Sequence, residues 1–254
     1  MTAPVRLLAL HGFLGQASDW DGLAEWFPEA SVTALDIWPV LDRPGVDDWA
    51  SLGGALDDAL LGAVAGDDRP AFVVAYSFGA RLALASALLA SGASPLRGAC
   101  FVSCNPGLAG DDRPARDERR ESDEAWAHRI LAWPEAEVWR AWDAQPVFEG
   151  GRHVGPRGAL PASRDTMARA LSRFSLAGQP DFLPRLRAWS GPLLWLTGER
   201  DAKFTAIARA LAEEGLPATF FTCEDAGHRV PWDNPSAFAR AVRTWMTRVM
   251  ETPR

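Results

Sequence analysis

Six short apolar runs, separated by stretches with helical periodicity, restrict the fold of this chain more than any other feature. The runs cover residues 5–10, 31–35, 71–76, 98–104, 192–198 and 218–223. They are continuously apolar rather than alternating with polar residues, which is typical of strands buried on both faces of a parallel sheet. Amphipathic patterns at 78–91, 203–214 and 235–250 predict helices between or after these strands. This order predicts an α/β fold with a mostly parallel, doubly wound sheet and right-handed crossovers.

Residues 105–190 interrupt this alternation. The segment contains no convincing strand pattern, is strongly charged near its start, and carries tryptophans at helix-like spacings. We therefore expect a helical cap, or lid, inserted after a sheet strand and lying over the carboxyl ends of the strands, with residues 1–104 and 191–254 forming the core domain. The cap segment has 13 basic and 13 acidic residues, whereas the remainder has 13 basic and 20 acidic. The net charge of −7 thus belongs to the core, and cap arginines are available to meet an anion.

Composition excludes several classes of function. A net charge of −7 argues against nucleic acid as the main partner, because phosphate binding needs a basic surface. No run reaches the ~20 apolar residues that a membrane span requires, and the run at 5–10 is too short for the apolar part of a signal peptide. We predict neither a nucleic-acid nor a membrane partner, and we make no prediction of the oligomeric state.

The cysteines and histidines indicate neither disulfide bonds nor a metal site. Cys100, Cys104 and Cys223 are odd in number and lack metal-ligand spacing, which favours buried thiols and a cytoplasmic location. We place Cys100 and Cys104 on one face of the strand at 98–104. The four histidines do not cluster in the sequence, so we predict no metal site.

The stretch "VVAYSFGARLAL" (73–84) nearly spells G-x-S-x-G, the strand–turn–helix that carries the nucleophile of α/β-hydrolases. Such a sharp turn needs small residues on both sides of the serine. Gly79 meets this need, and Ala75, which replaces the first glycine, adds only a methyl group. The alternative is that Ser77 merely caps an ordinary helix.

Two residues that follow later strands favour the catalytic alternative. Asp201 comes after the run at 192–198 and His228 after the run at 218–223, in the chain order Ser, acid, His that α/β-hydrolases use. Glu199 and Asp225 compete with Asp201 for the place of the acid. We predict a triad of Ser77, Asp201 and His228.

Backbone donors for a developing oxyanion can be predicted as well. The glycines of "HGFLG" (11–15) let the chain approach a ligand closely, so the N–H of Phe13 is one candidate. The N–H of Phe78, directly after the serine, is the other. We interpret His11 as a structural residue of this turn.

Residues around the serine indicate an anionic substrate. Arg81 lies four residues after Ser77, and Lys203, the only lysine of the chain, lies two residues after Asp201. Tyr76, the only tyrosine, directly precedes the serine. A site for neutral esters has no need of such cations, whereas a site for several carboxylates does. The alternative is that Arg81 and Lys203 pair with acids nearby.

Five further segments are more specific. They are "NPGL" (105–108), "SDEAWAHRI" (122–130), "AQPVF" (144–148), "SLAGQPD" (175–181) and "GERDAKF" (198–204). With "HGFLG", "YSFGAR" and "AGH", the chain resembles the 2-succinyl-6-hydroxy-2,4-cyclohexadiene-1-carboxylate synthases, the menaquinone-pathway enzymes of the α/β-hydrolase fold.

This resemblance implies a lyase that eliminates pyruvate from 2-succinyl-5-enolpyruvyl-6-hydroxy-3-cyclohexene-1-carboxylate without a metal or organic cofactor. The triad would act as a base on this small polycarboxylate. The substrate-binding residues that the resemblance implies are Tyr76, Arg81, Arg119, Trp142 and Lys203.

The chain departs from the family pattern at three places. Ala75 replaces the elbow glycine, and Asp143 and Ala144 stand in a stretch that is usually more aromatic and rich in amides. A further cap arginine is expected before "SLAGQPD", and either Arg157 or Arg164 is a candidate for it. The alternative functions are a serine hydrolase acting on an ester or carbon–carbon bond of a carboxylate-bearing substrate, and a binding protein that has lost catalysis.

Overall fold

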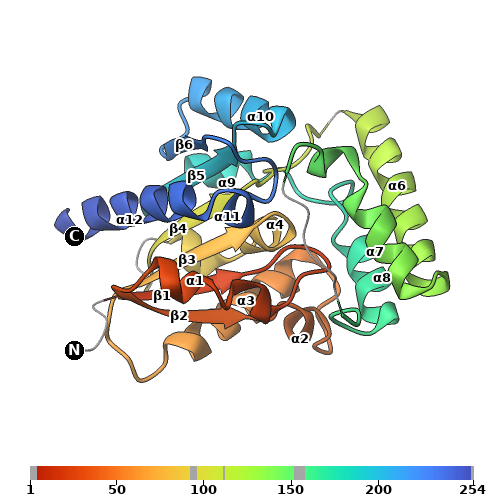
Figure 1. Cartoon of the computed structure of the whole chain (residues 1–254), viewed down its shortest axis with the longest axis horizontal. Helices are drawn as coiled ribbons and strands as arrows, with labels where there is room; N and C mark the ends of the chain where they lie inside the picture. The colour runs from red at the N-terminus through yellow and green to blue at the C-terminus, as the bar shows by residue number, and fades with distance from the viewer. Residues whose placement is uncertain (1–4, 92–95, 111, 152–157, 253–254) are drawn as a thin grey trace.

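A computed structural model describes residues 5–91, 96–110, 112–151 and 158–252. Its centre is a six-stranded sheet in the order β2-β1-β3-β4-β5-β6, in which all neighbours are parallel (Figure 1). The strands are β1 Val5–Leu10, β2 Ala30–Leu35, β3 Ala71–Tyr76, β4 Leu96–Val102, β5 Leu193–Gly198 and β6 Thr219–Cys223. The predicted doubly wound parallel sheet is therefore confirmed.

Helices and short 3-10 turns connect the strands. Before β4 these are η1 Ala17–Trp20, α1 Leu23–Trp26, α2 Trp38–Leu41, α3 Trp49–Val64, α4 Phe78–Ala83 and α5 Ala87–Ala90. Between β4 and β5 they are α6 Arg113–Ala132, α7 Glu135–Asp143, η2 Pro146–Phe148, α8 Arg164–Arg173 and α9 Leu183–Arg187. After β5 come α10 Ala202–Glu213, α11 Val230–Asp233 and α12 Pro235–Glu251.

The central strands are buried on both faces, as their apolar sequences require. Along β3, Phe72 and Val74 pack in one cluster with α1 and α12, whereas Val73 and Ala75 pack in another with α3, α4 and α8. Side chains of a strand alternate between its two faces, so a continuous apolar run supplies both clusters at once.

Two predicted elements differ from the observed ones. The helix expected over 78–91 is divided into α4 and α5, because Ser86 has extended backbone and its hydroxyl accepts from the N–H of Leu89 as a new helix cap. The strand expected at 98–104 ends at Val102, since Ser103 has a φ of 50°. This turn corrects the placement of the cysteines: Cys100 packs with α12, and Cys104 packs in the opposite cluster. All three cysteines are buried free thiols, as predicted.

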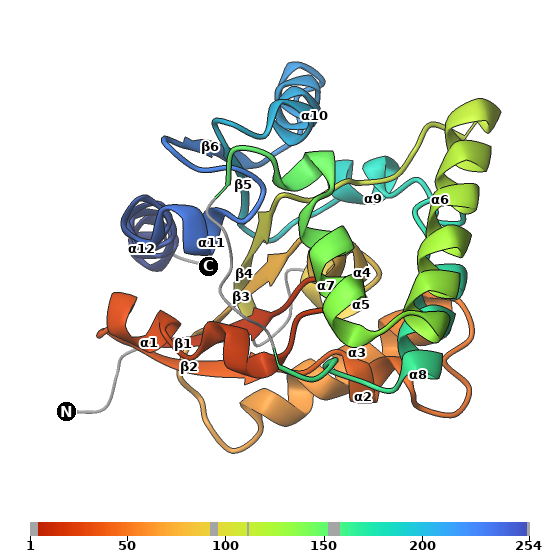
Figure 2. The ribbon, with the colours of Figure 1, turned by 45° about the vertical axis from the view of Figure 1, so that its right-hand side comes forward.

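The helices α6, α7 and α8 lie together at one side of the sheet in both views (Figures 1 and 2). The buried face of α6 packs against α8, and both helices contribute to the core that contains α3 and α4. No described residue between β4 and β5 forms a strand.

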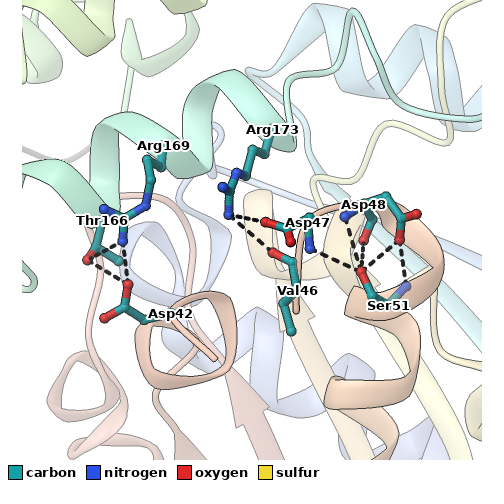
Figure 3. A network of polar contacts seen from close by, with 8 residues as sticks. All are labelled: Asp42, Val46, Asp47, Asp48, Ser51, Thr166, Arg169 and Arg173. Atoms are coloured by element: carbon teal, nitrogen blue, oxygen red, sulfur yellow. Dashed lines mark hydrogen bonds and ion pairs between the residues drawn. The ribbon is translucent and has the colours of Figure 1, made fainter. Parts of the chain in front are cut away.

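The helix α8 is tied to the loop between α2 and α3 by polar contacts (Figure 3). Arg169 Nη2 lies 2.5 Å from Asp42 Oδ1, and Arg173 Nη1 lies 2.7 Å from Asp47 Oδ1. Thr166 Oγ1 also donates to Asp42 at 3.1 Å. These pairs are largely exposed, so each stabilises weakly, but together they fix the position of α8 on the core.

Among the helices of the described residues, none is both long and apolar enough to cross a membrane.

Candidate active site

The turn from β3 to α4 places Ser77 in a strained conformation. Its φ of 51° and ψ of −110° are unusual for a residue with a side chain. Gly79 allows this turn, because a Cβ there would lie 2.3 Å from the carbonyl oxygen of His11. Ala75 is fully buried between Leu10 of β1 and Phe101 of β4. The strain, rather than a side-chain cap on α4, distinguishes Ser77 from an ordinary helix-capping serine.

The three residues predicted as a triad form a row in which His228 lies at hydrogen-bonding distance from both Ser77 and Asp201. Ser77 Oγ lies 3.0 Å from His228 Nε2, and His228 Nδ1 lies 2.7 Å from Asp201 Oδ2. The imidazole and the carboxylate are both buried. With Nδ1 donating to Asp201, Nε2 is free to accept the proton of Ser77, which is the arrangement a base-activated serine needs.

Asp201, and not either competing acid, faces the histidine. Its other oxygen accepts from the N–H of Phe204 at 3.2 Å and so caps α10. Asp225 pairs instead with Arg200, and Glu199 accepts from the N–H of Asp225, both at the surface.

The loop after β1 lies beside the serine. Phe13 and Phe78 pack edge to face with ring centroids 5.4 Å apart, and both line the same cavity as Ser77. No hydrogen bond from the N–H of either residue to another described residue is present. Both amides are therefore available as oxyanion donors. His11 is fully buried, with Nδ1 2.8 Å from the carbonyl oxygen of Gly12 and Nε2 accepting from the N–H of Ile37, which fits a structural role.

Ser77 and His228 open into a cavity of about 240 Å³, which we call the catalytic cavity. Three cationic side chains line it: Arg81 from α4, Arg119 from α6 and Lys203 from α10. They were predicted from different parts of the chain, and the fold brings them together beside the serine. Trp142, the predicted aromatic residue of the cap, lines the same cavity.

Arg81 is buried and bonded to neutral partners. Its Nε donates to Gln179 at 2.6 Å, and its Nη2 donates to the carbonyl oxygen of Phe174 at 2.7 Å. Burial, together with the charge of Arg119, lowers the pKa of Arg81 to about 9, although Asp123 acts in the opposite direction. A guanidinium in this position is stabilised by any carboxylate that enters the cavity.

Arg119 and Lys203 are more accessible. Arg119 pairs with the buried Asp123 one turn along α6, at 2.9 Å. Lys203 is exposed, and none of the ion pairs within the described part of the chain involves it. For Arg81 and Lys203, the alternative was that each pairs with an acid nearby. Neither side chain forms a direct ion pair among the described residues.

The other predicted binding residues lie elsewhere. Tyr76 lines a second cavity of about 380 Å³, where its ring packs against His228 and Trp232. Arg164 donates to the carbonyl oxygens of Ile130 and Trp133 at the end of α6, and it is not among the described residues lining the catalytic cavity. Arg157 lies outside the described residues.

Several residues at the site were not predicted. Ser103 donates to the carbonyl oxygen of His228 at 2.8 Å and anchors its loop. Gln179 links Arg81 to the carbonyl oxygen of Asn105. Asn105 and Gln179 belong to "NPGL" and "SLAGQPD", the segments on which the resemblance depends, so their position in these segments was the available signal. Among the described residues, no group of three or more His, Cys, Asp or Glu side chains is arranged to hold a metal ion.

Comparisons with known proteins agree with this geometry. The model of the alpha/beta hydrolase family matches residues 7–241. The 2-succinyl-6-hydroxy-2,4-cyclohexadiene-1-carboxylate synthase of Klebsiella pneumoniae (strain 342) is 36% identical over 246 residues, which cover 91% of this chain and 89% of that protein. The enzyme of the same name from Citrobacter koseri is 35% identical over 241 residues, with the same coverage.

Solved structures show the same fold. The structure of MenH from S. aureus superposes with a TM-score of 0.82 at 23% identity and covers 99% of this chain and 96% of that one. A thermophilic esterase from Thermogutta terrifontis superposes with a TM-score of 0.66 at 22% identity, over 96% of this chain and 90% of that one.

Proposed function

The chain belongs to the alpha/beta hydrolase family and, within it, to the 2-succinyl-6-hydroxy-2,4-cyclohexadiene-1-carboxylate synthases, and we propose that it catalyses their reaction. This membership confirms the resemblance drawn from its cap and loop segments. The proposed substrate is 2-succinyl-5-enolpyruvyl-6-hydroxy-3-cyclohexene-1-carboxylate, and the second product is pyruvate. The enzyme is then a lyase of menaquinone biosynthesis.

The observation that carries this proposal is the meeting of three cations with a base-activated serine in one cavity. The substrate has three carboxylates: one on the ring, one on the succinyl group and one on the enolpyruvyl group. Arg81, Arg119 and Lys203 supply three cationic side chains around Ser77, and Asp123, the one acid among the described residues that line the cavity, is paired with Arg119. Holding all three carboxylates fixes the ring relative to the serine, and such positioning contributes much of the rate in reactions of this kind.

The chemistry follows from the substrate. The ring carbon that bears the succinyl group is acidified by the adjacent ketone, so a base can remove its proton. The electrons of the broken C–H bond pass through the ketone and the ring double bond and expel the enolpyruvyl oxygen. Two ring double bonds result, and the departing enolate takes up a proton to become pyruvate. The net reaction consumes no oxidant, reductant or water.

We assign the base to Ser77, with its own proton passing to His228 while Asp201 holds the imidazole in place. Removal of the ring proton gives an enolate at the succinyl ketone. Its oxygen would lie between the N–H groups of Phe13 and Phe78, where each donor typically contributes a factor of ~10²–10³ to the rate. No covalent intermediate on Ser77 is required.

The test is pyruvate release by the purified protein supplied with this substrate, coupled to lactate dehydrogenase. Ser77→Ala should lower kcat by at least about 10²–10⁴-fold, the usual contribution of general base catalysis. Ser91→Ala, which removes an exposed hydroxyl just after α5, is the matched control and should leave kcat unchanged. Absence of pyruvate release by the unaltered protein would refute the proposal. A burst of product from activated esters instead would indicate a serine hydrolase.

We also propose that the protein is cytoplasmic, and that it is divided into a core domain and a cap formed by residues 105–190. Limited proteolysis that separates the cap segment from an intact core would support the division.

A further inference from the structure

The catalytic cavity and the second cavity share a wall of three aromatic side chains. Phe13, Trp142 and Phe148 line both cavities. We call these three residues the aromatic wall. Its members touch in a row: the ring centroids of Phe13 and Trp142 are 5.2 Å apart, and those of Trp142 and Phe148 are 6.2 Å apart. Two of the three come from the segment between β4 and β5, so the position of that segment decides whether the wall is closed.

Phe148 ends the wall next to the catalytic histidine. Its ring packs edge to face against His228 with centroids 5.7 Å apart. Phe148 belongs to the short 3-10 turn η2, in which no residue is fully buried. Packing of this turn alone therefore does little to fix the position of the Phe148 ring. Something else must keep this ring against His228.

Arg229 provides that hold. It directly follows His228, and its guanidinium lies over the ring of Phe148 at 3.8 Å from the centroid. The same guanidinium pairs with Asp143 at the end of α7, and both side chains are largely buried. A cation confined between an aromatic face and a carboxylate is favourably placed, because both contacts are shielded from water.

The ion pair joins the last residue of α7, in the segment between β4 and β5, to the loop that carries the catalytic histidine. It therefore links this segment to the core beside Phe148, the member of the aromatic wall that packs against His228.

We propose that Arg229 and Asp143 are positioning residues that hold Phe148 as a partition between the two cavities, and that this partition limits the size of the substituent accepted beside Ser77. The proposal rests on the proposed function only in requiring a reactive Ser77. Without the ion pair, the ring of Phe148 swings away and the catalytic cavity opens into the second one. Groups too bulky for about 240 Å³ then gain access to the serine.

The test measures how fast Ser77 is labelled by two phosphonates with the same 4-nitrophenyl leaving group, one carrying a methyl and the other a biphenyl substituent. In the unaltered protein the methyl compound should label faster. Arg229→Met and Asp143→Asn should raise the ratio of biphenyl to methyl labelling by up to roughly thirtyfold, the factor that corresponds to the ~2 kcal/mol of a desolvated cation–π contact. Arg240→Met is the matched control, because it removes an exposed ion pair with Glu224 that borders neither cavity among the described residues, and the ratio should stay unchanged.

A double-mutant cycle separates a positioning role from a merely structural one. Phe148→Ala should raise the ratio by itself, and adding Arg229→Met to it should change the ratio no further, since Arg229 acts through that ring. Additive effects would overturn the proposal. Variants that slow labelling by both phosphonates by the same factor would also overturn the proposal, because a general loss of structure affects small and large reagents equally.

Labelling also separates this inference from the proposed function. Protein that releases no pyruvate but shows the expected ratios has the partition and a different substrate. Protein that releases pyruvate although neither phosphonate labels Ser77 keeps the proposed function and overturns the partition.

Discussion

Replacing Arg81 by methionine should impair substrate binding far more than it impairs folding. Arg81 carries its charge in the core, and burial together with Arg119 lowers its pKa to about 9 from the usual 12.5. At 1.36 kcal/mol per pH unit, the folded protein disfavours the charged form by about 4–5 kcal/mol. The guanidinium is held in place despite this cost by its hydrogen bonds to Gln179 and to the carbonyl oxygen of Phe174.

Arg81→Met removes the charge and both hydrogen bonds together. The gain from removing a buried charge opposes the cost of two unsatisfied acceptors, about 1–3 kcal/mol each. We therefore expect a change in unfolding free energy within about 2 kcal/mol, or a Tm change within roughly 8 °C for a chain of this size. The loss of a charged contact to a substrate carboxylate should raise KM by about 10- to 100-fold.

Ligand-dependent stability distinguishes these two effects. A stable tricarboxylate analogue at 100 times its Kd should stabilise the unaltered protein by about 2.7 kcal/mol, measured as a rise in Tm by differential scanning fluorimetry. The same concentration should stabilise Arg81→Met little. A matched comparison is Arg97→Met, which removes an arginine that donates to the carbonyl oxygen of Val249 and lies at the end of β4 opposite to the site. Arg81→Met with an unchanged KM and a greatly lowered Tm would refute the reasoning, since Arg81 would then be a structural residue.

Three further predictions concern the same site. Because a bound carboxylate raises the pKa of Arg81, binding should take up a proton above pH 9, and 1/KM should fall by up to about tenfold per pH unit there, as steady-state kinetics from pH 7 to 11 would show. Arg119→Met should raise KM by roughly tenfold and should also lower Tm, because it leaves the buried carboxylate of Asp123 without its ion pair. Gly79→Ala should destabilise the fold by about 1–3 kcal/mol, measured by urea unfolding, because the new methyl group would meet the carbonyl oxygen of His11 at 2.3 Å.

The sheet could be predicted because burial on both faces leaves a direct mark in the sequence. A strand such as β3 must be apolar at every position, and all six runs became strands within about two residues of their expected bounds. The triad could be predicted for a related reason: parallel strands all end at one edge, so residues just after β3, β5 and β6 must gather there.

Other features left no local mark. The contact between Arg81 and Gln179 joins residues 98 positions apart, and the ion pair of Arg229 with Asp143 joins residues 86 apart. No periodicity encodes such pairs, since they exist only after the segment between β4 and β5 has packed on the core. The break between α4 and α5 was not predicted, because the apolar run continues on both sides of Ser86. The break depends on the extended backbone of Ser86, from which its side chain caps α5.

The alternation of side chains along β3 decides whether Tyr76 lines the catalytic cavity. Tyr76 is the last residue of β3 and shares a face with Phe72 and Val74, on the side covered by α12. Ser77 then turns the chain, and Arg81 on α4 packs toward the opposite face. The two residues that flank the serine in the sequence are therefore separated by the sheet, and only Arg81 lines the catalytic cavity. Tyr76 reaches the chemistry by another route, since its ring packs against His228 from the second cavity. This contact gives Tyr76 a route to influence catalysis through the orientation of the His228 imidazole.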